Sequence, residues 1–256
     1  MTPGGAVLGA AGVRVRRGRR VLLDDVTFAV RGGELVALRG GNGSGKTSLL
    51  RVLAGATAAA AGTVSRPAAC AFVPDRVRLA GGPRCGEWLA RLRALRGLAP
   101  IDWAGPLEAS GLAAAVLDQR CGELSKGMTQ RVALLEALTS GAPALVLDEP
   151  FSGLDHDGRV WLGGALAAQA GAGAAVLLSD HADQGAASWC RLTRALAIGD
   201  GTVVADGDAP PEAPAVTIRA VAADGAPLTR VVAGAEVDAT LRALLDAGAH
   251  ILEVTR

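Results

Sequence analysis

The spacing of apolar and polar residues along the chain predicts an alternation of short strands and helices. Segments that are apolar throughout, or that alternate apolar with polar residues, are expected to be strands; they cover residues 12–16, 21–30, 35–38, 69–73, 144–147, 174–178, 192–198 and 202–205. The first three favour a small antiparallel sheet, whereas the continuous apolar run at 144–147 is typical of a buried parallel strand. We therefore expect an α/β fold.

Helical periodicity predicts helices at residues 48–53, 87–98, 130–138, 158–169 and 182–189, with short helices and turns at 101–117. One face of the helix at 87–98 is apolar and carries Trp88, Leu89, Leu92, Leu95 and Leu98. We expect this face to join the core and the arginines of the same helix to lie mostly off it. The alanine-rich segment at 55–62 is interpreted as a connection without a strand.

The segment at 209–215 is rich in proline and is interpreted as a linker. It divides the chain into a main domain at 1–208 and a small C-terminal extension at 216–256. The extension has the pattern of two strands, an amphipathic helix and a third strand, which predicts a β-β-α-β unit. It carries no recognisable chemistry.

A glycine-rich loop stands between the strand at 35–38 and the helix after it. It consists of Gly40, Gly41, Asn42, Gly43, Ser44, Gly45, Lys46 and Thr47, which match the phosphate-binding pattern G-x-x-x-x-G-K-T, and Ser48 follows in the helix. The glycines let backbone N–H groups converge on an anion, while the lysine reaches the outer phosphates and the threonine hydroxyl binds Mg²⁺. Lys46 and Lys126 are the only lysines among 26 basic residues, so composition does not explain the lysine in this loop.

The apolar strand at 144–147 ends in two acids, Asp148 and Glu149. At the carboxyl end of a buried parallel strand such side chains reach a ligand, where one can hold Mg²⁺ and the other can accept a proton from water. His181 follows the strand at 174–178 and is expected at the same sheet edge, within reach of a γ-phosphate. Ser125 precedes the helix at 130–138 and is, in isolation, an ordinary N-cap.

Composition indicates a globular protein without a global nucleic-acid or membrane-surface signature. Apolar residues make up 50% of the chain, and 26 basic residues balance 25 acidic ones. The arginines at 14–20 partly alternate with valines, which favours the solvated face of a strand over a nucleic-acid patch. The four cysteines are widely spaced and fit reduced cytosolic thiols rather than a zinc site. We expect neither a signal peptide nor a membrane span.

The loop at 40–47 and four later strings, taken in order, resemble the ATP-binding subunit of ABC transporters. These strings are Leu124-Ser125-Lys126-Gly127-Met128, Leu145-Val146-Leu147-Asp148-Glu149-Pro150, Phe151-Ser152-Gly153-Leu154-Asp155 and Ser179-Asp180-His181. The resemblance spans the main domain at 1–208 and implies a P-loop NTPase fold with a RecA-like, mostly parallel sheet core. It also implies an N-terminal antiparallel β subdomain and an α-helical signature subdomain at about 76–140.

The resemblance assigns a role to each motif. The loop at 40–47 with Ser48 would bind ATP, with Lys46 on the outer phosphates. Thr47 and Asp148 would bind Mg²⁺, Glu149 would act as the catalytic base, and His181 would be the switch histidine. The implied activity is ATP hydrolysis coupled to transport.

Family members close two subunits head to tail, which extends the resemblance to partners. Ser125 and Gly127 of one copy would face the γ-phosphate held by Lys46 of the other, and Asp155 would belong to the D-loop. We expect a homodimer or a paired ATPase subunit, no nucleic acid, and transmembrane permease subunits that bind the helical region at 76–117. The protein would then be cytoplasmic and peripheral on the inner face of the cell membrane.

Three departures from the family pattern bear on the site. Lys126 and Met128 replace the residues that usually stand third and fifth in the signature, a variation similar to single-domain subunits of efflux systems, which favours export. Asp75 stands where a glutamine is usual and is a candidate metal contact. Arg17 stands near the usual position of the aromatic residue that stacks on adenine, so an arginine plane would serve instead.

Other classes of P-loop protein fit less well. A GTPase switch of the N-K-x-D type is excluded because Asn42 is the only asparagine. A small-molecule kinase would not explain the signature helix or the D-loop. The alternative within the superfamily is a non-transport ATPase that acts on the ribosome or on nucleic acid, but the chromosome ATPases insert long coiled coils and the translation factors carry two cassettes.

Overall fold

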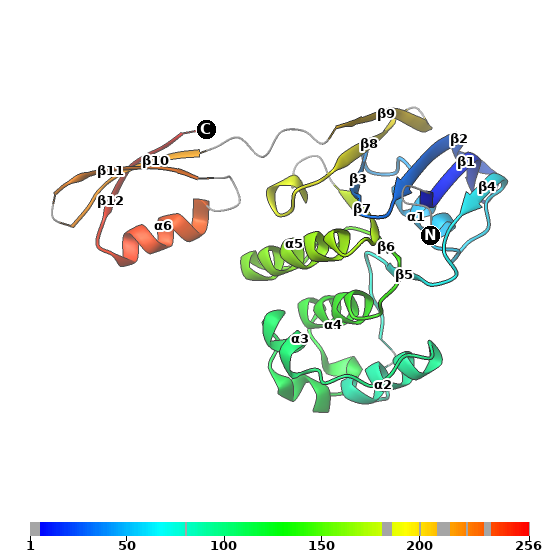
Figure 1. Cartoon of the computed structure of the whole chain (residues 1–256), viewed down its shortest axis with the longest axis horizontal. Coiled ribbons are helices and arrows are strands. Elements are labelled where there is room, and N and C mark those ends of the chain that lie inside the picture. The colour runs from blue at the N-terminus through cyan, green and yellow to red at the C-terminus, as the bar shows by residue number, and fades with distance from the viewer. Residues whose placement is uncertain are drawn as a thin grey trace.

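The computed structural model describes residues 6–79, 81–180, 186–199, 201–208, 216–223, 225–232 and 237–255. Figure 1 shows a central sheet with helices packed against it, a helical part built from α2, α3 and α4, and a three-stranded C-terminal sheet with one helix. Among the described residues, no helix is long and apolar enough to cross a membrane. All four cysteines are free thiols.

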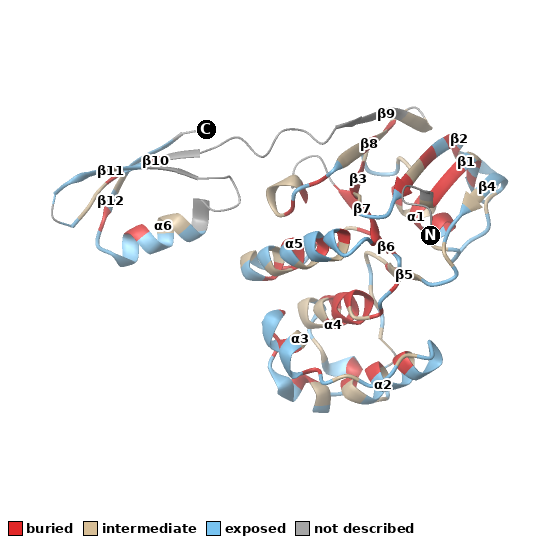
Figure 2. Ribbon diagram, viewed as in Figure 1, coloured by how far each residue is buried: buried red, intermediate tan, exposed pale blue. Residues whose placement is uncertain are grey.

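The central sheet has the strand order β5-β6-β7-β3-β8-β9. Its strands are β3 (Leu35–Arg39), β5 (Cys70–Val73), β6 (Ala144–Leu147), β7 (Ala175–Asp180), β8 (Arg194–Gly199) and β9 (Thr202–Asp208). All neighbouring pairs are parallel except β8 and β9, which are antiparallel. The predicted α/β fold is confirmed, and the fully apolar runs are the strands buried on both faces, as Figure 2 shows.

Side-chain alternation along these strands separates two cores. Leu35, Leu145 and Val176 point to one face and pack with α4 (Lys126–Leu138) and α5 (His156–Gly171). The residues next to them in sequence point to the other face and pack with α1 (Lys46–Leu53) and the N-terminal sheet. Because successive strand residues face opposite sides, each apolar run supplies both cores at once.

The N-terminal sheet is antiparallel, as expected, and has the order β2-β1-β4. It consists of β1 (Ala6–Arg17), β2 (Arg20–Arg31) and β4 (Ala61–Ser65). The third strand expected in it, at 35–38, was placed wrongly, because that segment is β3 and pairs with β7 and β8 in the central sheet. The interpretation of residues 55–62 as a plain connection was wrong at its end, because β4 begins at Ala61 and pairs with β1. A Cβ at Gly62 would lie 2.2 Å from the backbone oxygen of Gly12, so glycine permits the close pairing that a weakly apolar sequence did not reveal.

The helical part has its own core, built from α2 (Cys85–Leu95), α3 (Ala104–Ala109), the 3₁₀ turns η1 (Ala114–Asp118) and η2 (Cys121–Glu123), and α4. The prediction of a leucine stripe on α2 was partly wrong. Leu95 is 84% exposed, whereas Arg93 is buried in line with Cys85 and Leu89. Arg93 takes this place because its guanidinium donates to the carbonyls of Ala99 and Thr139, which satisfies its polar atoms.

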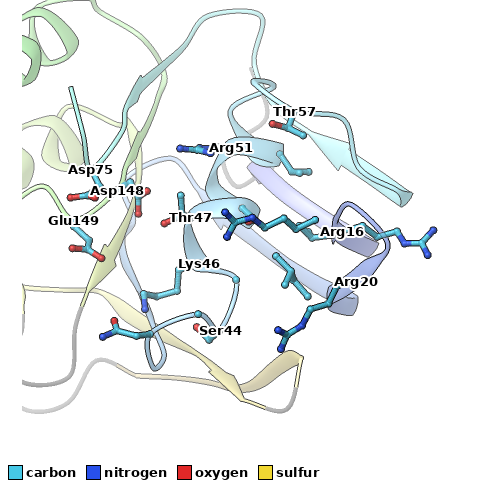
Figure 3. Close-up of a pocket in the computed structure, with 18 of the residues that line it drawn as sticks. Arg16, Arg20, Ser44, Lys46, Thr47, Arg51, Thr57, Asp75, Asp148 and Glu149 are labelled. Carbon is cyan, nitrogen blue, oxygen red and sulfur yellow. The ribbon is translucent and has the colours of Figure 1, made fainter. Parts of the chain in front are cut away.

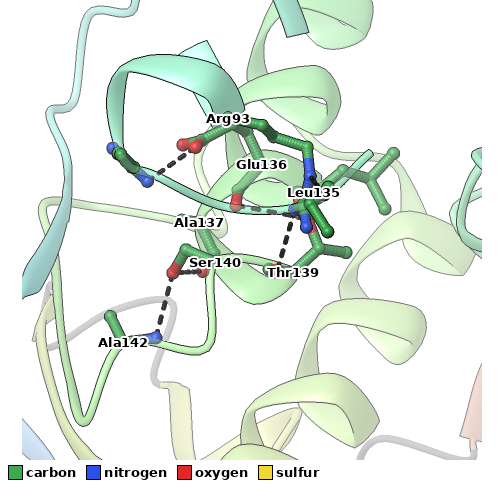
Figure 4. Close-up of polar contacts among 9 residues, drawn as sticks. Arg93, Leu135, Glu136, Ala137, Thr139, Ser140 and Ala142 are labelled. Carbon is green, nitrogen blue, oxygen red and sulfur yellow. Dashed lines mark hydrogen bonds and ion pairs between the residues drawn. The ribbon is translucent and has the colours of Figure 1, made fainter. Parts of the chain in front are cut away.

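A second polar contact ties the end of α2 to the end of α4 (Figure 4). Arg96 forms an ion pair of 2.6 Å with the carboxylate of Glu136, whose side chain is buried on α4. Burial raises the pKa of Glu136, although the arginine opposes that shift. Together with Arg93, this pair positions α4, the helix that begins just after Ser125.

The C-terminal elements follow the expected β-β-α-β order: β10 (Val216–Val221), β11 (Pro227–Val232), α6 (Val237–Asp246) and β12 (His250–Thr255). Their sheet has the order β11-β10-β12, and a small core of Ile218, Ala220, Leu244 and Ala249 lies beneath it. The linker at 209–215 lies outside the described residues. The division into main domain, linker and extension therefore stays a prediction.

Candidate active site

The glycine-rich loop connects β3 to α1 and curls around the lysine side chain. Gly43 and Gly45 have φ values of 79° and 105°, in the left-handed region that favours glycine. The buried Lys46 ammonium donates to the carbonyl oxygens of Gly40 and Gly41 at 2.6 and 3.1 Å. These hydrogen bonds hold the ends of the loop together. Lys46 is also the first residue of α1, so the loop stands at a helix N-terminus, where backbone N–H groups favour an anion.

This loop forms one wall of a cavity of about 760 Å³ (Figure 3). The other lining residues come from the N-terminal sheet, from α1 and the turn after it, and from the segments that follow β5 and β6: Val15, Arg16, Arg17, Arg20, Leu22, Thr47, Ser48, Arg51, Val52, Thr57, Asp75, Arg76, Asp148 and Glu149. The structure therefore brings the predicted loop and the predicted acids into one cavity.

Two acids follow β6 at its carboxyl end. Asp148 is only 1% exposed; its Oδ1 accepts a hydrogen bond of 2.7 Å from the Ser179 hydroxyl, and its Oδ2 has no partner among the described residues. The backbone N–H of Glu149 donates to the same hydroxyl at 2.8 Å, and Glu149 has a φ of 50°, which is uncommon for a residue with a side chain. One serine thus holds both acidic residues.

Ser179 was missed as a site residue by the sequence reasoning. It lies near the end of β7, the parallel neighbour of β6, so its hydroxyl reaches the two residues that follow β6. The available signal was a small polar residue in an otherwise apolar strand, beside a strand that ends in acids. Its neighbour His181 lies outside the described residues, so its predicted place at this sheet edge stays a prediction.

Asp75 and Arg17 both line the cavity, and their roles as a metal contact and a base contact stay predictions. Asp75 follows β5 and forms a long, solvent-exposed ion pair of 3.8 Å with Arg76. The interpretation of the N-terminal arginines as a purely solvated face was incomplete. Arg14 does pair with Asp24 in solvent, but three others, Arg16, Arg17 and Arg20, line the cavity.

The signature residues are not part of this cavity wall. Ser125 is the N-cap of α4, with its hydroxyl accepting the Met128 N–H at 3.2 Å, and Gly127 lies in the first turn. Asp155 is likewise an N-cap, of α5, and accepts the Gly158 N–H at 2.8 Å. That hydrogen bond, and then the nearby Arg131, lower the pKa of Asp155.

The arrangement suits a nucleoside triphosphate with a divalent cation. Backbone N–H groups and the buried ammonium of Lys46 bind phosphate oxygens. The unpartnered Oδ2 of Asp148 and the hydroxyl of Thr47 line the same cavity and are the hard oxygen donors that Mg²⁺ prefers, so these residues fit that ion. Glu149 is the carboxylate next to them that can accept a proton.

Comparison with known proteins identifies the family. The ABC transporter family model matches residues 23–80 and 99–152. The cytochrome c biogenesis ATP-binding export protein CcmA of Novosphingobium aromaticivorans is 39% identical over 172 residues, which cover 67% of this chain and 87% of that protein. The chain is an ABC transporter ATP-binding subunit. The zinc import ATP-binding protein ZnuC of Cereibacter sphaeroides is 41% identical over 156 residues, 60% of this chain and 63% of that protein.

Solved structures agree with this ABC assignment. An ATP-binding subunit of an ABC transporter has a TM-score of 0.72 at 28% identity, covering 79% of this chain and 90% of that one. A dimeric bacterial ABC transporter cassette has a TM-score of 0.69 at 19% identity over 79% and 98% of the two chains, a likeness of fold. As an ABC ATP-binding subunit, the chain binds and hydrolyses ATP in the service of a transporter, and the non-transport alternative is not favoured.

Proposed function

We propose that this ABC ATPase energises export, as a head-to-tail homodimer bound to transmembrane permease subunits on the cytoplasmic side of the membrane. One observation carries the dimer. Lys46, Asp148 and Glu149 meet in one cavity, whereas Ser125 and Gly127 lie outside its wall. The signature serine caps a helix N-terminus, a natural phosphate contact, so a second copy would supply the missing wall.

Export is supported by the relatives and by the signature variant. The CcmA relative, an export protein by name, is covered over 87% of its length, whereas the ZnuC relative, an import protein, is covered over 63%. Lys126 and Met128 also vary the signature in a way similar to efflux subunits.

In the proposed reaction, a water oxygen attacks the γ-phosphorus of ATP, and the bond to the β–γ bridging oxygen breaks to give ADP and phosphate. Glu149 accepts the proton of the attacking water, and Lys46 stabilises negative charge on the phosphoryl oxygens. Ser125 and Gly127 contact the γ-phosphate from the second copy, and His181 contacts it from the first. Magnesium, held by Thr47 and Asp148, would offset phosphate charge when bound.

At the far end of the cavity the arginines would receive the nucleoside. Figure 3 places Arg16 and Arg20 on the opposite side of Thr47 from Asp75, Asp148 and Glu149. With the triphosphate on the loop, the base would extend toward the ends of β1 and β2. We propose that the Arg17 guanidinium contacts the adenine plane there.

Complementation between two inactive variants tests the head-to-tail dimer. Lys46→Ala and Ser125→Ala are each expected to lose most ATPase activity. In a mixed dimer, one site would combine both defects while the other combines an intact loop with an intact signature. Mixing the two proteins should therefore restore activity that neither has alone. Absence of restoration, with both variants folded, would contradict the composite site.

Trapping the nucleotide-bound state provides a second test. Glu149→Gln should bind ATP without hydrolysing it and shift from monomer to dimer on adding ATP and Mg²⁺, as measured by light scattering after size-exclusion chromatography. Glu108→Gln, an exposed glutamate outside the cavity, is the matched control and should behave as the wild type. A Glu149→Gln protein that stays monomeric and binds no ATP would overturn the assignment.

The transport claim needs the membrane partner. Co-expression with its transmembrane permease subunits should move the protein into the membrane fraction, and recovery only in the soluble fraction would contradict the transport claim. In inside-out vesicles, ATP should drive accumulation of the transported compound if the system exports. ATP-driven loss of preloaded compound would instead indicate import.

A further inference from the structure

A group of arginines lines the end of the cavity away from the acids. Arg16, Arg17 and Arg20 belong to the hairpin of β1 and β2, and all three are lining residues. Figure 3 shows Arg16 and Arg20 on the opposite side of Thr47 from the acidic lining residues. In the described part of the chain, the hairpin arginines therefore line a region of the cavity whose wall has no acidic side chain.

The hairpin holds its arginines close together although their charges repel. Arg17 and Arg20 are directly opposite each other in the β1–β2 ladder, and Gly18 between them has a φ of 61°. Like charges in such a cross-strand pair destabilise a sheet. Among the described residues neither arginine forms an ion pair, whereas Arg14 of the same sheet pairs with Asp24 at 2.7 Å. An electron-rich ligand in the cavity would relieve this repulsion.

The wall at this end also limits which hydrogen bonds a ligand can make. A guanidinium group carries hydrogen-bond donors and no acceptor. The other lining residues of the hairpin, Val15 and Leu22, are apolar. Thr57, on the same side of Thr47 as the hairpin arginines in Figure 3, adds one hydroxyl. The side chains here are thus mainly donors, and they suit a base edge that presents acceptors.

Purine bases differ in this respect at position 6. Guanine presents two acceptors on one edge, O6 and N7, and an arginine can bind both at once. Adenine presents the donor amino group N6 beside N7, and a guanidinium has no acceptor for that group. A donor-rich wall therefore favours a 6-oxopurine over adenine.

We propose that the arginines of the β1–β2 hairpin make the cavity prefer nucleotides of 6-oxopurines, guanine or hypoxanthine, to nucleotides of adenine. This inference rests on the proposed function, in which the loop at 40–47 binds the triphosphate and the base lies at the hairpin. Arg17 contacts the plane of the base, and Arg16 and Arg20 donate to its edge. ATP remains a substrate, held through its phosphates, and the 6-oxopurine nucleotides bind more tightly.

The same wall predicts which group of guanine is not recognised. The 2-amino group of guanine is a donor, and no described carboxylate lines this end of the cavity to accept from it. Hypoxanthine lacks that amino group but keeps O6 and N7. Inosine and guanosine nucleotides should therefore bind equally well.

The test compares nucleoside diphosphates that differ only in the base. GDP and IDP carry a 6-oxo group, whereas ADP and the diphosphate of 2,6-diaminopurine riboside carry a 6-amino group. Calorimetry on the whole chain with Mg²⁺ gives each dissociation constant, and diphosphates have no γ-phosphate to be hydrolysed during the titration. We expect GDP and IDP to bind at least about fivefold more tightly than the two 6-amino compounds.

Substitutions assign the preference to the hairpin. Arg16→Met combined with Arg20→Met removes the donors, keeps much of each stem and should abolish the preference. Arg20→Gln alone places an acceptor beside a donor, the combination that binds adenine, and should strengthen ADP binding relative to GDP. Arg19→Met is the matched control, because Arg19 lies in the same turn but outside the cavity wall. It removes the same charge and should keep the wild-type ratios.

Two failures can be distinguished. If the wild type binds ADP as tightly as GDP and IDP, or if the double variant keeps the preference, the inference is overturned while the nucleotide site stands. If the wild type binds none of the diphosphates, the proposed function falls and the inference with it. Thermal unfolding identifies a variant that has lost its fold, and the comparison of bases on the wild type needs no variant.

Discussion

Replacing Ser179 by alanine should disable the site and lower stability at the same time. The hydroxyl donates to Asp148 Oδ1 and accepts from the Glu149 N–H, at 2.7 and 2.8 Å, in a buried environment. Its removal leaves two buried polar groups without this partner, each costing about 1–3 kcal/mol. We expect the free energy of unfolding to fall by about 2–6 kcal/mol, or roughly 4–24 °C in melting temperature for a protein of this size.

The same change should reduce kcat more than it raises KM for ATP. Glu149 sits at an uncommon φ of 50° that the Ser179 contact helps to hold, whereas the Lys46 ammonium is held by the carbonyls of Gly40 and Gly41. A tenfold fall in kcat corresponds to about 1.4 kcal/mol of lost transition-state stabilisation, which a small displacement of the base would cause.

Urea unfolding and steady-state ATPase assays measure both effects in one preparation. Ser110→Ala is the matched control, because Ser110 is equally buried and donates to the Leu107 carbonyl far from the cavity. It should lose about 1 kcal/mol and keep its kcat. If Ser179→Ala loses stability with an unchanged kcat, the serine has no positioning role; if stability is also unchanged, the hydrogen-bond account is wrong.

Substitutions on α5 test its packing, and a substitution of its N-cap, Asp155, tests how stability depends on pH. Gly163→Ala would place a Cβ 1.8 Å from the Trp189 carbonyl oxygen and should lower the free energy of unfolding in urea by about 3 kcal/mol. Gly164→Ala is the control: its Cβ would enter open space and should stabilise the helix by up to about 1 kcal/mol. Equal effects of the two changes would refute this packing. Asp155→Ala should remove about 1 kcal/mol of N-cap stabilisation at pH 7. Because the folded-state pKa of Asp155 is lowered, its contribution is present above the unfolded pKa of about 4 and is lost as the pH falls through the folded value. The difference in unfolding free energy between wild type and Asp155→Ala should therefore shrink from pH 5 to pH 3, and a constant difference would contradict this.

Periodicity predicted most elements because their residues carry the information locally. The fully apolar strand β6 and the apolar first four residues of β7 are the clearest example, since burial on both faces favours apolar residues at successive positions. Predictions of burial were wrong where a contact outside the helix or strand decides which side chain is buried. Arg93 is buried because Thr139 and Ala99 offer carbonyls to it, and no pattern within α2 could reveal those partners.

The sequence by itself determined those parts of the site whose residues are neighbours along the chain. The curl of the loop at 40–47 and the two acids after β6 follow from residues next to one another, so their order already pointed to an ATPase. Only the tertiary structure decided how these pieces meet. Strand pairing across the parallel sheet brings the Ser179 hydroxyl into hydrogen-bond contact with Asp148 and Glu149. It also places Asp75 beside these acids, although Asp75 and Ser179 are far from them in sequence. Their relation depends on register and burial, which are properties of the folded sheet rather than of any segment.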